Sequence, residues 1–119
     1  MGSVKLPDGS VRAADVAWIS RETWDTLSVD DRRGFASVPP DFVIELLSSS
    51  DNFDEAHRRL EMWVSNGAGL GWLIDASGRA VTIYRPGREG EHRQAVDHVE
   101  GEGPVAGLLL TLSNRFALP

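Results

Sequence analysis

The sequence predicts a single α/β domain with a mixed β-sheet and flanking helices. Its 119 residues suit one compact domain with a modest core. Several short apolar stretches bounded by turn residues are typical of strands. One amphipathic stretch between them is typical of a helix. Neither a repeat nor a linker divides residues 1–119, so we expect one domain.

Composition narrows the class of protein. The net charge of −6 and the pI of about 4.9 argue against a protein that coats nucleic acid, which usually has a basic face. They do not exclude a nuclease, whose metal site is itself acidic. The absence of cysteine excludes disulfides and thiolate metal sites. The sequence has neither an 18-residue apolar run nor a signal peptide, so we expect a cytoplasmic protein without a membrane span.

The first third of the chain predicts a turn, a strand and a polar connection. Residues 6–10 (LPDGS) form a turn signal, and residues 11–19 (VRAADVAWI) read as one strand. Its alternation places Asp15 and Ala17 on one face and Val16 and Trp18 on the other. Residues 20–34 are polar and predict a short helical turn or loop, with Trp24 as one possible anchor.

The middle of the chain predicts a buried strand followed by a helix. Residues 42–48 (FVIELLS) fit a strand buried on both faces. A helix follows, with Ser50, Asp51 or Asn52 as N-cap and Gly67 at its C-terminal end. Its apolar stripe consists of Phe53, Ala56, Leu60, Trp63 and Val64.

The last third predicts a hairpin and an apolar tail. Residues 72–75 and 80–85 read as the two strands, with Ser77 and Gly78 in the turn. A polar loop leads to an edge strand expected over residues 94–99. The apolar residues 108–112 are expected to dock on the core.

Two acidic residues interrupt the predicted strands. Glu45 lies inside an apolar run, where an unpaired carboxylate is costly. If its strand pairs with that of Asp15, both carboxylates converge and form an oxygen-rich site suited to Mg²⁺. The alternative is that Asp15 is a cap or is solvated, and that Glu45 pairs with an arginine.

Four sequence blocks together resemble the Uma2 family (formerly DUF820). They are AADVAWI, PPDFVIELLSSSD, a helix that ends in NG, and LGWLID followed by VTIYRPG. The similarity extends from about residue 6 to the C-terminus. The family belongs to the PD-(D/E)XK, restriction-endonuclease-like superfamily. The resemblance therefore implies a mixed sheet flanked by helices, Mg²⁺ as cofactor and DNA as the partner.

The resemblance also implies site residues. Asp15 matches the aspartate of the PD element, and Glu45 matches the acid of the (D/E)XK element. The backbone carbonyl of Leu46 would be a further metal ligand. The superfamily lysine would fall at Leu47 and is absent. In Uma2-like proteins a lysine of the following helix takes its place, and here the matching residue is Arg59.

Three departures from the family pattern leave a second function open. Ala14 replaces the proline of the PD element, and Arg59 replaces a lysine that it cannot match as a proton donor or base. The family also has an N-terminal helix and hairpin before this strand, so we expect a shortened fold with an uncovered sheet that favours a homodimer. The alternative function is a catalytically inactive dimeric domain that binds nucleic acid or protein; a fragment without a role of its own is a third possibility.

Arg59 has structural alternatives as well. It could pair with Glu55 on the helix surface, or form a structural salt bridge with Glu45. The histidines are expected at the surface and the four tryptophans in the core. The hairpin arginines could contact a phosphate backbone, although solvation is the simpler expectation. These arginines are Arg79, Arg85, Arg88 and Arg93.

Overall fold

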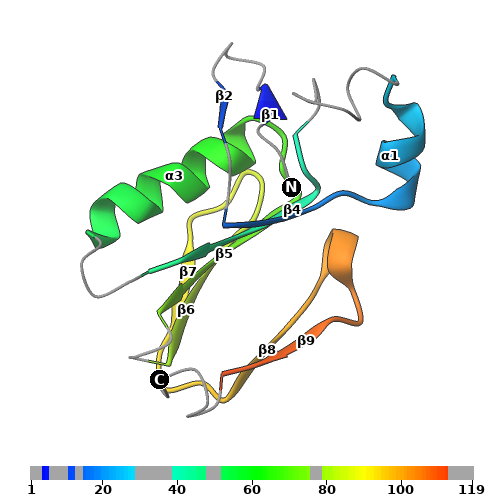
Figure 1. The fold of residues 1–119 in the computed structure, drawn as a ribbon. Coiled ribbons are helices and arrows are strands. Elements are labelled where there is room, and N and C mark those ends of the chain that lie inside the picture. The colour runs from blue at the N-terminus through cyan, green and yellow to red at the C-terminus, as the bar shows by residue number, and fades with distance from the viewer. Residues whose placement is uncertain are drawn as a thin grey trace.

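A mixed five-stranded sheet forms the centre of the protein (Figure 1). A computed structural model describes residues 4–5, 11–12, 15–28, 39–47, 52–75 and 79–112. The strand order is β3-β4-β5-β6-β7; only β4 and β5 pair in parallel, which confirms the predicted mixed α/β class. The strands are β3 (Val16–Trp18), β4 (Phe42–Leu46), β5 (Leu70–Asp75), β6 (Ala80–Tyr84) and β7 (Glu91–Arg93).

Two small sheets accompany the central one. One consists of β1 (Val4–Lys5) and β2 (Val11–Arg12). The other consists of β8 (His98–Glu100) and β9 (Leu109–Thr111), joined through the short 3₁₀ helix η1 (Gly103–Val105). The single strand expected over residues 11–19 was wrong, because β2 pairs with β1 while β3 pairs with β4. The expected turn at residues 6–10 lies outside the described residues.

The predicted helix is α3 (Phe53–Ser65). The side chain of Asn52 caps it by accepting hydrogen bonds from the backbone N–H groups of Asp54 and Glu55. Gly67 follows the C-terminal end with a φ of +115°, a conformation that glycine adopts without strain. The other cap candidates, residues 50 and 51, lie outside the described part. Phe53 is 42% exposed, contrary to the expected stripe, because its ring stacks on His57 in the first turn instead of entering the core.

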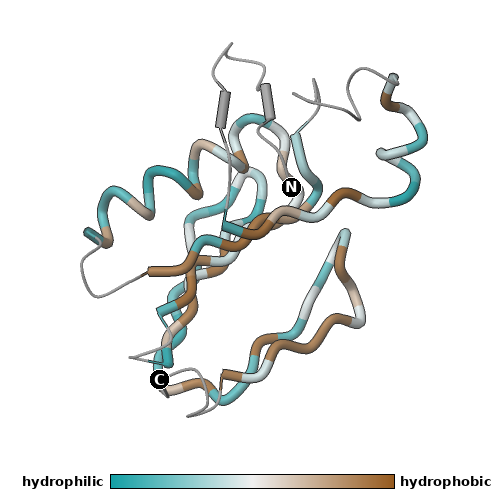
Figure 2. Tube along the Cα trace, in the orientation of Figure 1, coloured by the Kyte–Doolittle hydropathy of each residue, from teal (hydrophilic) through white to brown (hydrophobic). Residues whose placement is uncertain are grey.

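Each face of the central sheet buries its own apolar core. On one face α3 packs through Ala56, Leu60 and Trp63. The approach is close, since a Cβ atom on Gly71 would lie 2.7 Å from a methyl group of Leu60. The β8–β9 hairpin covers part of the other face. The tail predicted to dock there does so in part: Leu112 is 1% exposed and Leu110 packs against this core, whereas Leu109 is 59% exposed. Figure 2 shows hydrophobic residues concentrated along the central strands and this hairpin.

Of three further predictions, one is confirmed, one was wrong and one holds in part. The hairpin of β5 and β6 is confirmed. The edge strand expected at residues 94–99 was wrong, because the chain turns at Ala95, with a φ of +54°, between β7 and β8. Two tryptophans are not core residues: Trp18 is 41% exposed on the edge strand β3, and Trp24 is 39% exposed on α1 (Arg21–Thr26). Among the described residues, the helices are too short and too polar to cross a membrane.

Candidate metal and phosphate site

The two predicted carboxylates lie on neighbouring strands. Strand β3 runs antiparallel to β4, with Val16 opposite Ile44 and Ala17 opposite Val43. Asp15 directly precedes Val16, and Glu45 directly follows Ile44. An Asp15 carboxylate oxygen, Oδ2, accepts a 2.8 Å hydrogen bond from the backbone N–H of Leu46. The structure therefore brings Asp15 to the peptide that follows Glu45.

Glu45 is buried in the core between β4 and α3. Only 4% of the residue is exposed, whereas Asp15 is exposed. The Nε–H group of Arg59 donates to Glu45 Oε2 over 3.3 Å. The other carboxylate oxygen, Oε1, is buried and has no hydrogen-bond partner among the described residues. Such an oxygen is costly unless a proton or a cation reaches it.

The electrostatics of the site disfavour a negative charge on Glu45. Burial is the largest cause that raises the pKa of Glu45, and the neighbouring Asp15 carboxylate raises it further. The Arg59 charge, the Arg59 hydrogen bond and the nearby indole N–H of Trp63 lower the pKa but do not outweigh the other two. The Arg59 pair therefore compensates only part of the cost of burying this carboxylate.

Arg59 bridges the protein core and solvent. Its side chain is 43% exposed, while that of Glu45 is 5% exposed. Of the two partners expected from the sequence, Glu45 and Glu55, the structure places Arg59 against Glu45. The guanidinium has further N–H groups that can meet an anion at the surface.

Strand β4 ends beside these groups. Leu46 is 51% exposed, so this end of the strand reaches solvent. Leu47 donates its backbone N–H to the carbonyl of Ile74 and packs its side chain against the first core. The position where the superfamily lysine would fall thus carries an apolar side chain within the protein.

No group of three or more metal-binding side chains occurs in the described part of the chain. The candidate site therefore consists of two carboxylates, the adjoining backbone and solvent. Mg²⁺ commonly binds in this way, since it takes one or two carboxylates and retains several waters.

The arginines near the hairpin are held by acidic side chains. Arg85 binds Glu102 through two hydrogen bonds of 2.8 Å and Glu91 through one of 2.9 Å. Arg93 also pairs with Glu91, and Arg79 pairs with Asp97. These contacts lower the pKa values of Glu91 and Glu102, chiefly through hydrogen bonds from the arginines. Three of the four hairpin arginines are thus committed to ion pairs.

Two of the three histidines contact hydroxyl groups of β6. His57 Nδ1 lies 2.7 Å from the hydroxyl of Tyr84, and burial raises the pKa of that hydroxyl to about 12. His92 Nδ1 lies 2.8 Å from Thr82 Oγ1. Sequence reasoning placed these histidines at the surface and did not find their partners on β6.

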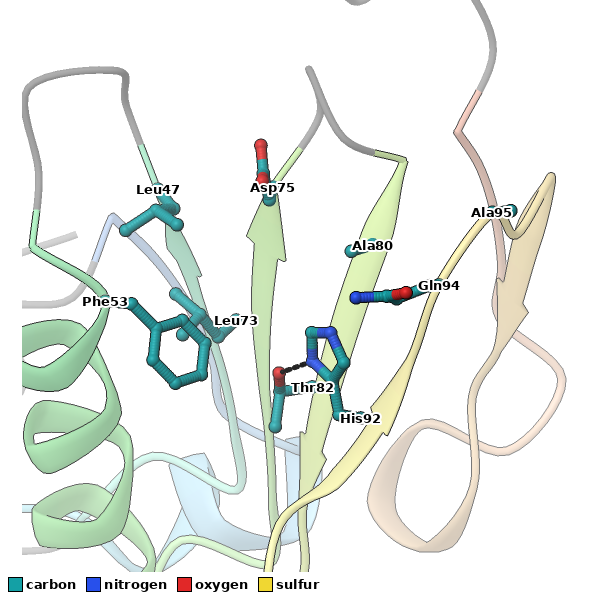
Figure 3. A pocket seen from close by; sticks show the side chains of 9 residues that line it. All are labelled: Leu47, Phe53, Leu73, Asp75, Ala80, Thr82, His92, Gln94 and Ala95. Atoms are coloured by element: carbon teal, nitrogen blue, oxygen red, sulfur yellow. Dashed lines mark hydrogen bonds between the residues drawn. The ribbon is translucent and has the colours of Figure 1, made fainter.

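A pocket that the sequence did not reveal opens on the α3 side of the sheet (Figure 3). Its volume is about 380 Å³. Phe53 approaches it from α3, while His92 and Gln94 approach it from the β7 side. The signal in the sequence was Thr82, a polar residue inside the apolar run AVTIY. The lining residues are Leu47, Phe53, Leu73, Asp75, Ala80, Thr82, His92, Gln94 and Ala95.

Comparisons with known proteins agree with this architecture. A crystal structure of a "putative nuclease belonging to DUF820" from Anabaena variabilis ATCC 29413 matches with a TM-score of 0.74 and 21% sequence identity. The match covers 97% of this chain and 64% of the other, so the chain spans somewhat less than two thirds of its structural relative. No curated protein matches.

The family comparison covers nearly the whole chain. The model of the Uma2 family, described as "Putative restriction endonuclease", matches residues 3–117. This range includes Asp15, Glu45 and Arg59. The chain therefore belongs to the Uma2 family and has the fold of its nuclease-like structural relative.

Proposed function

We propose that the protein hydrolyses phosphodiester bonds of DNA with the help of Mg²⁺. The observation that carries this proposal is the buried Oε1 of Glu45, which has no hydrogen-bond partner in the described part of the chain. A second carboxylate, Asp15, is held at the adjoining peptide. The protein thus concentrates negative charge at a place where its own groups compensate it only in part.

Mg²⁺ fits the donor set of this site. Asp15 and Glu45 would hold it, with the backbone carbonyl of Leu46 as a third ligand. These are hard oxygen donors, and the exposed side of Asp15 leaves room for the waters that Mg²⁺ retains. When bound, Mg²⁺ would supply an activated water and neutralise charge that develops on the phosphate.

Arg59 would hold the scissile phosphate. Its Nε–H group is engaged by Glu45, which fixes the orientation of the guanidinium plane. Since the side chain is 43% exposed, its remaining N–H groups can donate to phosphate oxygens. The guanidinium stays charged at neutral pH and does not serve as the base, so Arg59 binds and orients the phosphate.

Cleavage of a supercoiled plasmid tests the proposal. We expect the wild-type chain to nick the plasmid in the presence of Mg²⁺. The variants Asp15→Ala and Glu45→Gln should lose this activity while they stay folded. Equal nicking by the wild type and both variants would contradict the proposal, because a contaminating nuclease gives that pattern. Arg88→Gln is a matched control, since Arg88 is an exposed arginine far along the chain from the three site residues.

The second candidate function is that of an inactive binding domain on the same scaffold. The observation that favours it is Arg59 at the position where the family resemblance implies a lysine. The variant Arg59→Lys separates the two candidates. Cleavage gained by Arg59→Lys from an inactive wild type would show an intact metal site that lacks only its lysine, and would favour the second candidate for the natural chain.

We also propose that the chain forms a homodimer in the cytoplasm. Among the described strands, β3 is an edge of the central sheet, so no described strand pairs with one side of its backbone. An apolar groove lies beside it, between the sheet and the β8–β9 hairpin, with Val16, Trp18 and Leu108 exposed at its walls. A second copy offers the same edge and the same apolar groups, which suits a two-fold contact.

A further inference from the structure

The pocket in Figure 3 lies on the same face of the sheet as Glu45. Glu45 is the registered neighbour of Leu73 on β5, and Leu73 is the neighbour of Thr82 on β6. Thr82 is in turn the neighbour of His92 on β7. Because adjacent strands are about 4.8 Å apart, Thr82 lies roughly 10 Å from Glu45 across the sheet.

Glu45, Leu73, Thr82 and His92 thus form a row across the sheet, and their side chains divide this row into two regions. Leu73 forms the boundary: it neighbours the carboxylate on one side and lines the pocket on the other. The region beyond it is a hollow of about 380 Å³. This volume falls within the range of roughly 300–1,000 Å³ typical of sites for small organic groups.

The pocket combines an aromatic wall with polar groups. Phe53 is 42% exposed and is held between two histidines, stacked on His57 at 5.9 Å and edge-on to His92 at 6.2 Å. The contact between His92 Nδ1 and the buried Thr82 hydroxyl orients the imidazole. Its Nε2 then donates in one tautomer and accepts in the other. Gln94 adds an amide that carries both donors and an acceptor.

These features match a planar heterocycle better than a phosphate. Aromatic side chains bind bases by stacking, and amide and imidazole groups read their edges. The described lining residues include no arginine or lysine that would bind an anion. A phosphate would therefore bind at the Arg59 side of Leu73 and not in the pocket.

We propose that this pocket binds a single nucleobase. The inference deepens the proposed function and rests on it for the source of that base, a nucleic acid whose phosphate lies at Glu45. The base would leave its stack and enter between Phe53 and the β7 side, with Gln94 and His92 on its edge. The unpaired base of a single strand or of a distorted duplex enters at the lowest cost.

The binding of dAMP tests the pocket without any cleavage step. The probe is titrated in the absence of metal, and the ring resonances of His92 are followed by NMR. We expect dAMP to shift them, while 2-deoxyribose 5-phosphate, which lacks the base, leaves them in place. The variants Phe53→Ala and Gln94→Ala should each weaken dAMP binding, the former by about tenfold. Trp24→Ala is the matched control, because it removes an equally exposed aromatic ring from a different helix.

Two results would overturn the inference. One is an equal response to dAMP and to the base-free sugar phosphate. The other is unchanged dAMP binding in both pocket variants. Neither depends on hydrolysis, so a failure of the plasmid assay and a failure of base binding are separate outcomes. If dAMP binds, an oligonucleotide with one abasic position identifies the source of the base. Weaker binding than that of the intact strand assigns the base to a nucleic acid. Equal binding assigns it to a free nucleotide.

Discussion

The Asp15 carboxylate accepts a 2.8 Å hydrogen bond from the backbone N–H of Leu46. This contact joins β3 to β4 immediately beyond their last registered pair, Val16 and Ile44. It also keeps the Asp15 charge near Glu45, where it raises the pKa of the buried carboxyl group. The same contact thus stabilises the end of the sheet and increases the cost of ionising Glu45.

The variant Asp15→Ala should separate these two effects. Loss of the hydrogen bond should reduce the free energy of unfolding by up to about 1 kcal/mol, because the contact is exposed to solvent. The pKa of Glu45 should fall, since one of the two causes that raise it is removed. Chemical denaturation measures the first effect, and NMR titration of the Glu45 carboxyl carbon measures the second. An unchanged pKa would show that Asp15 does not act on Glu45.

The variant Glu45→Gln should be at least as stable as the wild type at pH 8 in the absence of metal. The pKa of Glu45 is raised above its ordinary value of 4.5 in the folded state. In the pH interval above 4.5, the folded chain therefore retains a proton that the unfolded chain releases. The free energy of unfolding consequently falls as the pH rises. Glutamine resembles the protonated form and removes this dependence. Unfolding curves of the wild type and the variant at pH 4.5 and pH 8 measure it.

The variant Glu102→Gln is the matched control and should behave in the opposite sense. Hydrogen bonds from Arg85 lower the pKa of Glu102, so its contribution is present at neutral pH and is lost as the pH falls below about 4.5. Glu102→Gln should therefore destabilise at pH 8. If Glu45→Gln is the strongly destabilised variant instead, Glu45 and Arg59 form a structural salt bridge.

The variant Trp18→Ser should weaken self-association. Trp18 is 41% exposed on the edge strand β3 and lines the apolar groove. Burial of a tryptophan at the centre of an interface commonly dominates its affinity, so the dimer dissociation constant should rise by at least about tenfold. Sedimentation velocity over a range of concentrations measures this change. Trp24→Ser provides the control, since Trp24 is 39% exposed and is not among the groove residues. An equal effect of both variants would exclude this interface. So would a wild type that is monomeric at every concentration.

The sequence predicted those parts of the fold in which local and tertiary preferences agree. Helix α3 and the β5–β6 hairpin carry periodicity, capping and turn signals that all favour one structure. The chain around residues 11–19 was predicted less well, because strand pairing partners are not encoded locally. The same limit applies to the change of direction at Ala95, where a non-glycine residue adopts a positive φ.

The candidate site was likewise predicted in part. An acid inside an apolar run pointed to Glu45, and the structure places Asp15 and Arg59 beside it. Thr82 was the one signal for the pocket in the sequence. Its walls could not be predicted, because Phe53, Thr82 and His92 come from three separate elements that meet only in the folded protein. The exposure of Phe53 also contradicted its place in the helical stripe, and that exposure is what makes its ring available to a ligand.

Calorimetric titration with Mg²⁺ and Mn²⁺ tests the central claim most directly. The wild-type chain, Glu45→Gln and the control Glu102→Gln are compared at pH 8. High pH favours metal binding to a carboxyl group whose pKa is raised, because binding requires the ionised form. We predict that the wild type and Glu102→Gln bind the metal and that Glu45→Gln does not, while it remains folded. A lack of binding by the wild type, or equal binding by all three proteins, would contradict the assignment of Glu45 as a metal ligand.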